Sequence, residues 1–360
     1  MVRPGLLPRL AHDVQNRGIT AWLLAVVFAL FYMLLYFTER LTPVARSLGM
    51  DSKWTLYGTL YTIAILAGGI HMLRKYRHNR YQVIRTGVVM FVQVTFAYSI
   101  PHLLKAFHQP EYYFSYLWPL KFEYLTPYLF SLPLPFIVFS IAGSLVMVPL
   151  LGIFFGKRWY CSWVCGCGGL ANTFGEPWRH LSDKSAASWR FEKASIYTVL
   201  GVCLVLTVLL FASWGAGPRY PAFASVVARF QWLYSLVVLS ILSGVVGVGL
   251  YPLGGTRVWC RFFCPMAALL GVVQKAGRYR IRVKANMCIS CGLCSKYCEM
   301  GIDVRAYAQA GVSFTRASCV GCGLCAEVCP RGVLRLENGR APAPPASLIQ
   351  ISAAAGSAFR

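Results

Sequence analysis

Residues 288–298 read CISCGLCSKYC, and residues 319–329 read CVGCGLCAEVC. Each run has four cysteines in the pattern C-x2-C-x2-C-x3-C, and the two runs start 31 residues apart. A cubane [4Fe–4S] cluster needs four thiolates at its corners, and three cysteines separated by two residues each can wrap a tight loop around it. The doubled pattern therefore predicts a short domain, residues 284–339, that binds two such clusters.

The fourth cysteine of each run lies further along the chain and is expected to reach the other cluster, as in bacterial two-cluster ferredoxins. The first cluster is then expected to be held by Cys288, Cys291, Cys294 and Cys329. The second is expected to be held by Cys319, Cys322, Cys325 and Cys298. Gly292 and Gly323 are expected to let the backbone approach the clusters closely. Zinc sites, which use isolated C-x2-C pairs, and disulfides are the weaker alternatives.

Glu299 follows the first run at the place where Pro330 follows the second. The cysteine spacing is intact, so cluster binding is expected to survive this difference. A carboxylate beside Cys298 is expected to lower the midpoint potential of the cluster that Cys298 serves, because negative charge nearby opposes reduction.

The rest of the chain has the composition of a membrane protein. Hydrophobic residues make up 57% of the 360 residues and charged residues only 13%, whereas about 25% is typical of soluble domains. Six apolar stretches are long enough to cross a bilayer as helices, which takes about 20 residues. They lie at residues 18–37, 54–72, 86–104, 135–155, 195–214 and 232–252. The expected fold is an α-helical integral membrane bundle of six helices, residues 18–283, with a C-terminal α+β two-cluster ferredoxin-like domain.

Basic residues between the apolar stretches indicate the orientation. With residues 1–17 placed inside the cell, the short inner segments hold 14 Lys and Arg and the outer segments hold 7. Cytoplasmic loops carry such an excess, so we expect a multi-pass protein of the inner (cytoplasmic) membrane with both termini in the cytoplasm. The net charge of +23 is then explained by the anionic membrane face and not by nucleic acid. Residues 340–360 are expected to form a disordered tail.

A second group of cysteines follows the fourth and the sixth stretch. Residues 156–170 read GKRWYCSWVCGCGGL, and residues 255–269 read GTRVWCRFFCPMAAL. Gly, Arg, two Cys and Leu align at an offset of 99 residues, which indicates an internal repeat. Cysteines at i and i+4 share one helix face, so the repeat is expected to bring two pairs together at the inner membrane surface. The candidates are Cys161, Cys165, Cys167, Cys260 and Cys264.

The chemistry of this second group is open. Its thiols could hold a third cluster or another metal, or they could carry out thiol–disulfide chemistry. The alternative without chemistry is the packing of small, soft side chains at helix ends. Cys203, alone inside the fifth stretch, is expected to be a packing residue. The aromatic segment 106–134 is expected to be interfacial or re-entrant.

The two Cys-x3-Cys motifs, the apolar stretches and the C-terminal cysteine runs together resemble the NapH/NosR-type membrane polyferredoxins over residues 86–339. The resemblance matches Cys161, Cys165, Cys260 and Cys264 to the family's motif, and it implies a quinol-linked electron carrier that serves a periplasmic reductase or its maturation. The first motif departs from the family because Gly166 stands where the family has proline. Neither the periplasmic flavin-binding domain of NosR nor the immunoglobulin-like domain of the CcoG type is expected, so the resemblance does not identify the partner.

We therefore expect a membrane-bound iron–sulfur protein that passes electrons between a quinol pool or a cytoplasmic donor and a partner redox enzyme. It is expected to be a component of an oxidoreductase system and not a stand-alone enzyme. Its partners would be redox proteins, quinol and membrane lipids, and not nucleic acid. The alternatives are an assembly or metal-handling factor that delivers copper to a respiratory enzyme, and a membrane redox sensor.

Overall fold

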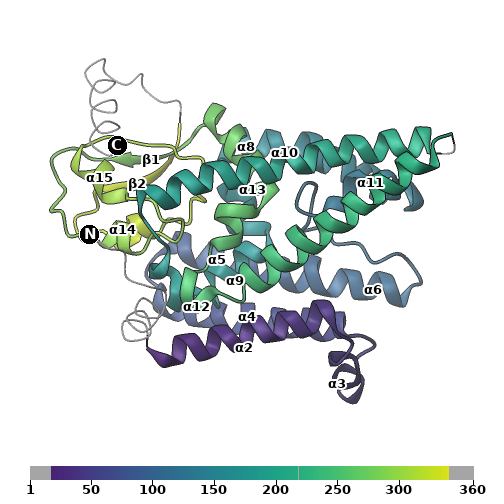
Figure 1. Cartoon of the computed structure of the whole chain (residues 1–360). Coiled ribbons are helices and arrows are strands. Elements are labelled where there is room, and N and C mark those ends of the chain that lie inside the picture. Colours follow the sequence, from purple (N-terminus) through teal and green to yellow (C-terminus); the bar gives the residue numbers. More distant parts are fainter. Residues whose placement is uncertain (1–17, 218, 340–360) are drawn as a thin grey trace, which may run out of the picture.

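The computed structural model describes residues 18–217 and 219–339. The expected N-terminal cytoplasmic segment, residues 1–17, and the expected disordered tail, residues 340–360, lie outside the described residues. In Figure 1 a bundle of helices extends along the molecule, and a small unit containing β1, β2, α14 and α15 lies at one end of it.

Six helical segments are long and apolar enough to cross a membrane. They are Ile19–Phe37, Lys53–Lys75, Arg80–Ala106, Leu134–Phe155, Ala186–Ala216 and Pro221–Val246. Only 17–33% of the apolar part of each is buried inside the protein, so most of these side chains face outward. Apolar helices without a protein cover on most of their surface suit lipid as the surrounding solvent. The expected bundle of six membrane helices is confirmed.

The described α-helices of the bundle range in length from 4 to 31 residues. They are α2 (Ile19–Phe37), α3 (Leu41–Ser47), α4 (Lys53–Lys75), α5 (Arg80–Val92), α6 (Ile100–Ala106), α7 (Leu134–Ala142), α8 (Val148–Phe155), α9 (Gly166–Asn172), α10 (Ala186–Ala216), α11 (Pro221–Tyr234), α12 (Tyr251–Gly254) and α13 (Pro265–Val273). π-Helical segments lie at Gln93–Ser99, Gly143–Met147, Trp159–Val164, Ser235–Val246 and Trp259–Phe263. 3-10 helices lie at Phe122–Leu125, Pro127–Ser131, Glu176–Leu181 and Gln274–Ala276.

The fifth and sixth spans begin earlier than their apolar stretches indicate. Helix α10 starts at Ala186, well before residue 195, and the Ser185 side chain caps it by accepting the backbone N–H of Ser188. Helix α11 starts with Pro221 in its first turn, where residues 215–231 were expected to form a loop. Hydropathy detects the part of a helix that contacts lipid, and both of these extensions contain polar residues.

The C-terminal unit, residues 279–339, is the expected small α+β fold and is called the ferredoxin region below. Strand β1 (Tyr279–Val283) pairs antiparallel with β2 (Leu334–Asn338), with Tyr279 opposite Asn338. Between the strands lie three short helices: α14 (Leu293–Lys296), α15 (Val304–Gln309) and α16 (Leu324–Glu327). The fold starts with β1, just before residue 284, because the cysteine pattern carries no signal for a strand that precedes it.

The aromatic segment 106–134 folds back into the bundle. The backbone N–H of Trp118 donates to Ser144 Oγ at 3.1 Å, and its indole N–H donates to Thr207 at 3.2 Å. The hydroxyl of Tyr160, the residue before Cys161, donates to the carbonyl of Ser115 at 3.0 Å. The segment therefore reaches from the end of α6 to the neighbourhood of the second cysteine group.

Candidate iron–sulfur sites

The ferredoxin region contains two pockets, and each is lined by four cysteines. The first pocket, about 350 Å³ in volume, is lined by Cys288, Cys291, Cys294 and Cys329. The second pocket, about 380 Å³, is lined by Cys319, Cys322, Cys325 and Cys298. The fold thus gathers the two sets that the spacing predicts, including the exchange of the fourth cysteine between the runs. All eight thiols are free.

The backbone around these pockets fits bound clusters. Gly292 and Gly323 adopt φ angles of 78° and 79°, which glycine reaches without strain. The backbone N–H of Val333 points to Cys329 Sγ at 3.4 Å. Hydrogen bonds of this kind favour a thiolate, which is the form that binds iron.

The two pockets differ in their access to solvent. At the first pocket Cys291 is exposed, and the neighbouring Ile289 keeps 57% of its surface accessible. Exposed Arg305 and Arg331 also line this pocket. The first pocket therefore opens to the surface of the ferredoxin region.

The second pocket is closed by the helix bundle. At the start of α5, the Tyr81 hydroxyl donates to the Gly321 carbonyl at 2.8 Å. Gln82 Nε2 and Arg85 Nη1 both donate to the carbonyl of Cys322, at 2.9 and 3.0 Å. A β-carbon on Gly321 would lie 2.5 Å from Arg158 Cβ, so the loop and the bundle are in direct contact there.

Further hydrogen bonds attach neighbouring parts of the ferredoxin region to the bundle. Ser162 Oγ donates to the Val320 carbonyl at 2.6 Å, and Ser182 Oγ donates to the Glu299 carbonyl at 2.6 Å. The buried Lys157 donates to the Ala317 carbonyl at 3.0 Å. The contacts come from several segments of the bundle, so the second pocket has a fixed position relative to the membrane helices.

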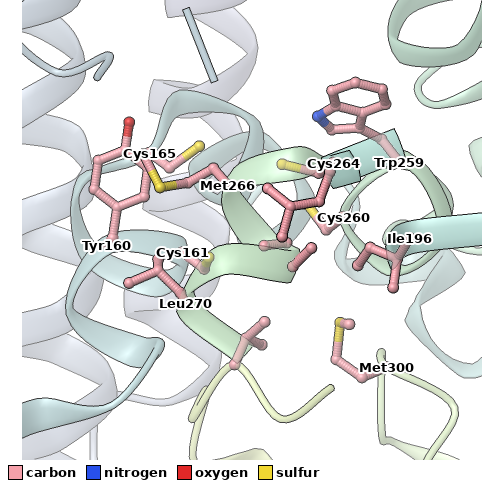
Figure 2. Packing of buried hydrophobic residues seen from close by; sticks show 14 of the residues in the cluster. Tyr160, Cys161, Cys165, Ile196, Trp259, Cys260, Cys264, Met266, Leu270 and Met300 are labelled. Atoms are coloured by element: carbon pink, nitrogen blue, oxygen red, sulfur yellow. The ribbon is translucent and has the colours of Figure 1, made fainter. Parts of the chain in front are cut away.

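The second cysteine group forms one buried cluster. Cys161, Cys165, Cys260 and Cys264 are at most 6% exposed and belong to a single hydrophobic core. Figure 2 shows these four side chains with Tyr160, Trp259 and Met266 around them. Cys167 is half-buried and packs against the same core. These five residues are called the bundle cysteines below.

The two copies of the motif have the same backbone conformation. Gly156 and Gly255 open them with positive φ angles of 67° and 84°. Cys161 and Cys260 then lie in short π-helical segments, which are frequent at functional sites. Cys165 and Cys264 follow with extended backbone and begin helices α9 and α13. At the offset of 99 residues, Cys167 aligns with Met266.

Hydrogen bonds to sulfur and burial act in opposite directions on the pKa values of the bundle cysteines. The thiol of Cys167 and the backbone N–H groups of Gly168 and Cys167 donate to Cys165, and together they lower its pKa to about 7 despite burial. In the second copy, burial raises the pKa of Cys264 well above its usual value, and a hydrogen bond from the backbone of Ala267 opposes this only in part. Burial raises the pKa of Cys161 to about 12, so this thiol is protonated at neutral pH unless a metal or another cation binds it.

The two copies touch at Gly168. A β-carbon there would lie 1.9 Å from the carbonyl oxygen of Cys161 and 3.2 Å from Arg257 Nη1. The same Arg257 atom points to the Cys161 carbonyl at 3.4 Å and to Cys260 Sγ at 3.7 Å. Arg257 therefore links a backbone group of one copy to a thiol of the other.

We expect Gly168→Ala to distort the first copy and its contact with Arg257 of the second, because the added methyl group has no room beside the Cys161 carbonyl. The cost should be about 1–3 kcal/mol, as for other overpacked sites. The measurement is thermal unfolding in detergent together with iron content. Gly201→Ala in α10 is the matched control, because a β-carbon there meets nothing within 4 Å. Equal unfolding temperatures for the two variants would contradict the expectation.

Sequence reasoning missed a group of buried charged residues between the second pocket and the bundle cysteines. Glu299 is fully buried and forms ion pairs with Arg179 at 3.0 Å and with Arg257 at 2.9 Å. Burial would raise the pKa of Glu299, but the two arginines outweigh it and hold the pKa below its usual value. The sequence contained one signal, namely that Glu299 stands where the other run has a proline.

This geometry revises the expectation for Glu299. The carboxylate was expected to act on its neighbouring cluster as an isolated negative charge. It is instead neutralised by two arginines, so the net local charge beside Cys298 is positive.

The comparisons with known proteins agree with these sites. Residues 281–336 match the family described as 4Fe-4S dicluster domain. Residues 137–183 and 235–284 match the family described as 4Fe-4S binding domain, and each of these two stretches contains one copy of the bundle cysteine motif. The ferredoxin region thus binds iron–sulfur clusters.

Several curated proteins are similar to parts of the chain. The putative electron transport protein YccM of Escherichia coli is 28% identical over 41% of this chain and 43% of its own length. The methylamine utilization ferredoxin-type protein MauN of Methylobacillus flagellatus is 26% identical over 44% of this chain and 54% of its own. The chain spans about half the length of the curated relatives it matches. No solved structure matches it. The chain thus combines six helices that are long and apolar enough to cross a membrane with regions that match 4Fe-4S families, and it is similar over part of its length to proteins named for electron transport and as ferredoxin-type.

Proposed function

We propose that this protein carries electrons between a soluble redox protein, which docks at the first pocket, and a partner within or across the membrane. The observation that supports this most is the different access of the two pockets. The first opens to solvent at Cys291, whereas the loop that lines the second contacts α5, and Arg257 links Glu299 of its lining to Cys260. An electron path from a partner at the surface into the bundle needs an exposed first site followed by a second site at the bundle.

The side chains around the pockets have distinct tasks in this proposal. When bound, the clusters would accept and release single electrons. Arg158 lies over the ring of Tyr279 at 4.9 Å, and the Tyr279 hydroxyl lies 3.9 Å from Cys319 Sγ. This pair shields the second pocket from water and places a hydrogen-bond donor beside a ligand sulfur, which tunes its basicity.

We further propose that the bundle cysteines hold a third cluster, with Cys161, Cys165, Cys260 and Cys264 as ligands. The repeat supplies the four thiols symmetrically, and backbone N–H groups point to Cys165 and Cys264. The match to the 4Fe-4S binding domain in both copies supports a cluster over packing alone. Cys167 has a methionine as its counterpart, so it is left out of the ligand set.

The proposed location is the inner (cytoplasmic) membrane, with the ferredoxin region and both termini in the cytoplasm. The excess of Lys and Arg in the segments near the ferredoxin region supports this orientation. The membrane-side partner would be quinol or a partner redox enzyme. Tyrosine rings pack against one another in the bundle: the ring centroids of Tyr57 and Tyr61 are 5.5 Å apart, and those of Tyr32 and Tyr57 are 5.9 Å apart. Such amphipathic side chains suit a quinol ring and its hydroxyl groups.

One observation favours a second function, metal handling for a respiratory enzyme. Buried Met266 belongs to the same hydrophobic core as Cys165, so thioether and thiol sulfur are both available there. Soft sulfur ligands of this kind suit Cu(I). We rank this function below electron transfer, since it leaves the exposed first pocket without a task.

The proposed function is tested in liposomes that contain the purified protein and a quinone, without oxygen. We expect reduced ferredoxin or flavodoxin added outside to bleach the cluster absorbance, and the quinone to be reduced only when the protein is present. Cys203→Ser is the matched control, because Cys203 lies in α10 outside both pockets. Reduction by a quinol analogue but not by the soluble donors would reverse the entry point. No response to either donor would refute the proposal.

A further inference from the structure

Three arginines are buried where the ferredoxin region meets the bundle. Arg85, Arg179 and Arg257 are each 1% exposed. They come from α5, from the 3-10 helix Glu176–Leu181 and from the start of the second cysteine motif, so the fold assembles them from distant parts of the chain. Buried arginines are rare in proteins and normally have an anionic partner.

The three buried arginines carry more positive charge than the carboxylates that contact them neutralise. Within residues 18–217 and 219–339, Glu299 is the one carboxylate that forms ion pairs with them, through Arg179 and Arg257. Arg85 has neutral partners instead, namely the Cys322 carbonyl at 3.0 Å and the Asn172 amide oxygen at 3.3 Å. Three guanidinium groups thus share one carboxylate.

Several donors of the same arginines have no hydrogen-bond partner among the described protein atoms. They are Arg85 Nε and Nη2, Arg179 Nε and Arg257 Nε. A buried N–H group without a partner is costly. Both the charge excess and the free donors therefore call for an anion at this place.

The position of the three arginines identifies this anion. Arg85 donates to the carbonyl of Cys322, and Glu299 follows Cys298 in the chain. The arginines and their carboxylate partner therefore lie next to two cysteines that line the second pocket. On its other side Arg257 points to Cys260 Sγ at 3.7 Å. An iron–sulfur cluster with four thiolate ligands is an anion, and it becomes more negative on reduction.

We propose that Arg85, Arg179 and Arg257 are the counter-charge of the second cluster and hold its midpoint potential above that of the first. This inference rests on the proposed electron-carrier function and gives it a direction. One electron leaves the first site and one arrives at the second, and no bond forms or breaks. Electrons would thus move from the surface toward the bundle.

The arginines of the first pocket differ from those at the second in their exposure, and this difference sets the proposed direction of electron transfer. The two arginines of the first pocket, Arg305 and Arg331, are exposed to solvent. Water and salt screen exposed charges, whereas buried charges interact through a low-dielectric interior. Positive charge near both clusters therefore stabilises reduction much more strongly at the second.

The test measures the midpoint potentials of the two clusters in the ferredoxin region by EPR-monitored titration with redox mediators under anaerobic conditions. We expect Arg179→Gln to lower the second midpoint alone, shifting the electron partition between the clusters about tenfold, or about 59 mV for one electron. Glu299→Gln, which removes the negative charge, should raise the same midpoint. Arg179→Lys should restore it, and Arg305→Gln is the control for an exposed charge.

Opposite shifts for Arg179→Gln and Glu299→Gln cannot come from a merely structural role. Equal shifts of both midpoints, shifts of the same sign, or no shift in either variant would overturn the inference. Iron content identifies a variant that fails to load, and Glu299→Gln, which keeps the side-chain shape, still decides the question in that case. Equilibrium midpoint potentials are measured without a partner protein. The titration therefore still tests this inference if electron transfer fails in the liposome assay.

Discussion

Replacing Cys322 with serine is expected to remove about four iron atoms per chain and to loosen the ferredoxin region from the bundle. Cys322 lines the second pocket, and its own carbonyl accepts hydrogen bonds from Gln82 and Arg85. A cluster replaces much of the hydrophobic core in so short a fold, so its loss should unfold the loop that carries these contacts. Iron analysis and EPR should show one ferredoxin-type signal lost.

Two variants serve as controls for this prediction. Cys203→Ser changes a buried thiol in α10 and should leave the iron content unchanged. Cys291→Ser lies in the first pocket, on the side away from the bundle contacts, and should remove about four iron atoms without loosening the region. Limited proteolysis measures whether the ferredoxin region is loosened from the bundle. Equal protease resistance for Cys322→Ser and Cys291→Ser would contradict the coupling between the second pocket and the bundle.

The sequence predicted those parts of the site that depend on local spacing. In each cysteine run, the first two thiols lie in a loop and the third lies in the short helix that follows it, and all three line the same pocket. Gly292 and Gly323 follow the second cysteine of each run because the loop turns there with a positive φ. The six membrane helices were predictable for a similar reason, since lipid contact requires an apolar stretch of fixed length.

Features that depend on long-range contacts were not predictable. The first turns of helix α10, which begins at Ala186, contain the buried Glu192, which pairs with Arg261 at 2.8 Å and accepts a hydrogen bond from Ser318. Hydropathy scores such residues as polar and therefore begins the span too late. The buried arginines were hidden for the same reason. Arg85 looks in the sequence like one more basic residue of an inner segment, and only the fold shows that it reaches Cys322.

The combined substitution of Cys161 and Cys260 by serine is expected to lower the iron content from about 12 to about 8 atoms per chain. Each copy of the motif then loses one proposed ligand, and serine does not replace a thiolate on iron. Both residues are buried among apolar side chains and differ from serine by one atom, so the bundle should keep its fold. The two ferredoxin-type EPR signals should persist, because the pockets that contain them are lined by other cysteines.

Cys167→Met is the matched control, because it makes the first copy identical at this position to Met266 in the second. If the ligands are the four repeated thiols, this variant should keep about 12 iron atoms. Loss of iron in Cys167→Met would instead make Cys167 a ligand. About 8 iron atoms in the unsubstituted protein would exclude a third cluster. Titration with Cu(I) would then distinguish a copper site from thiols that only pack. A copper site must lose affinity for Cu(I) in the double serine variant. Thiols that only pack would bind Cu(I) neither in the unsubstituted protein nor in the variant.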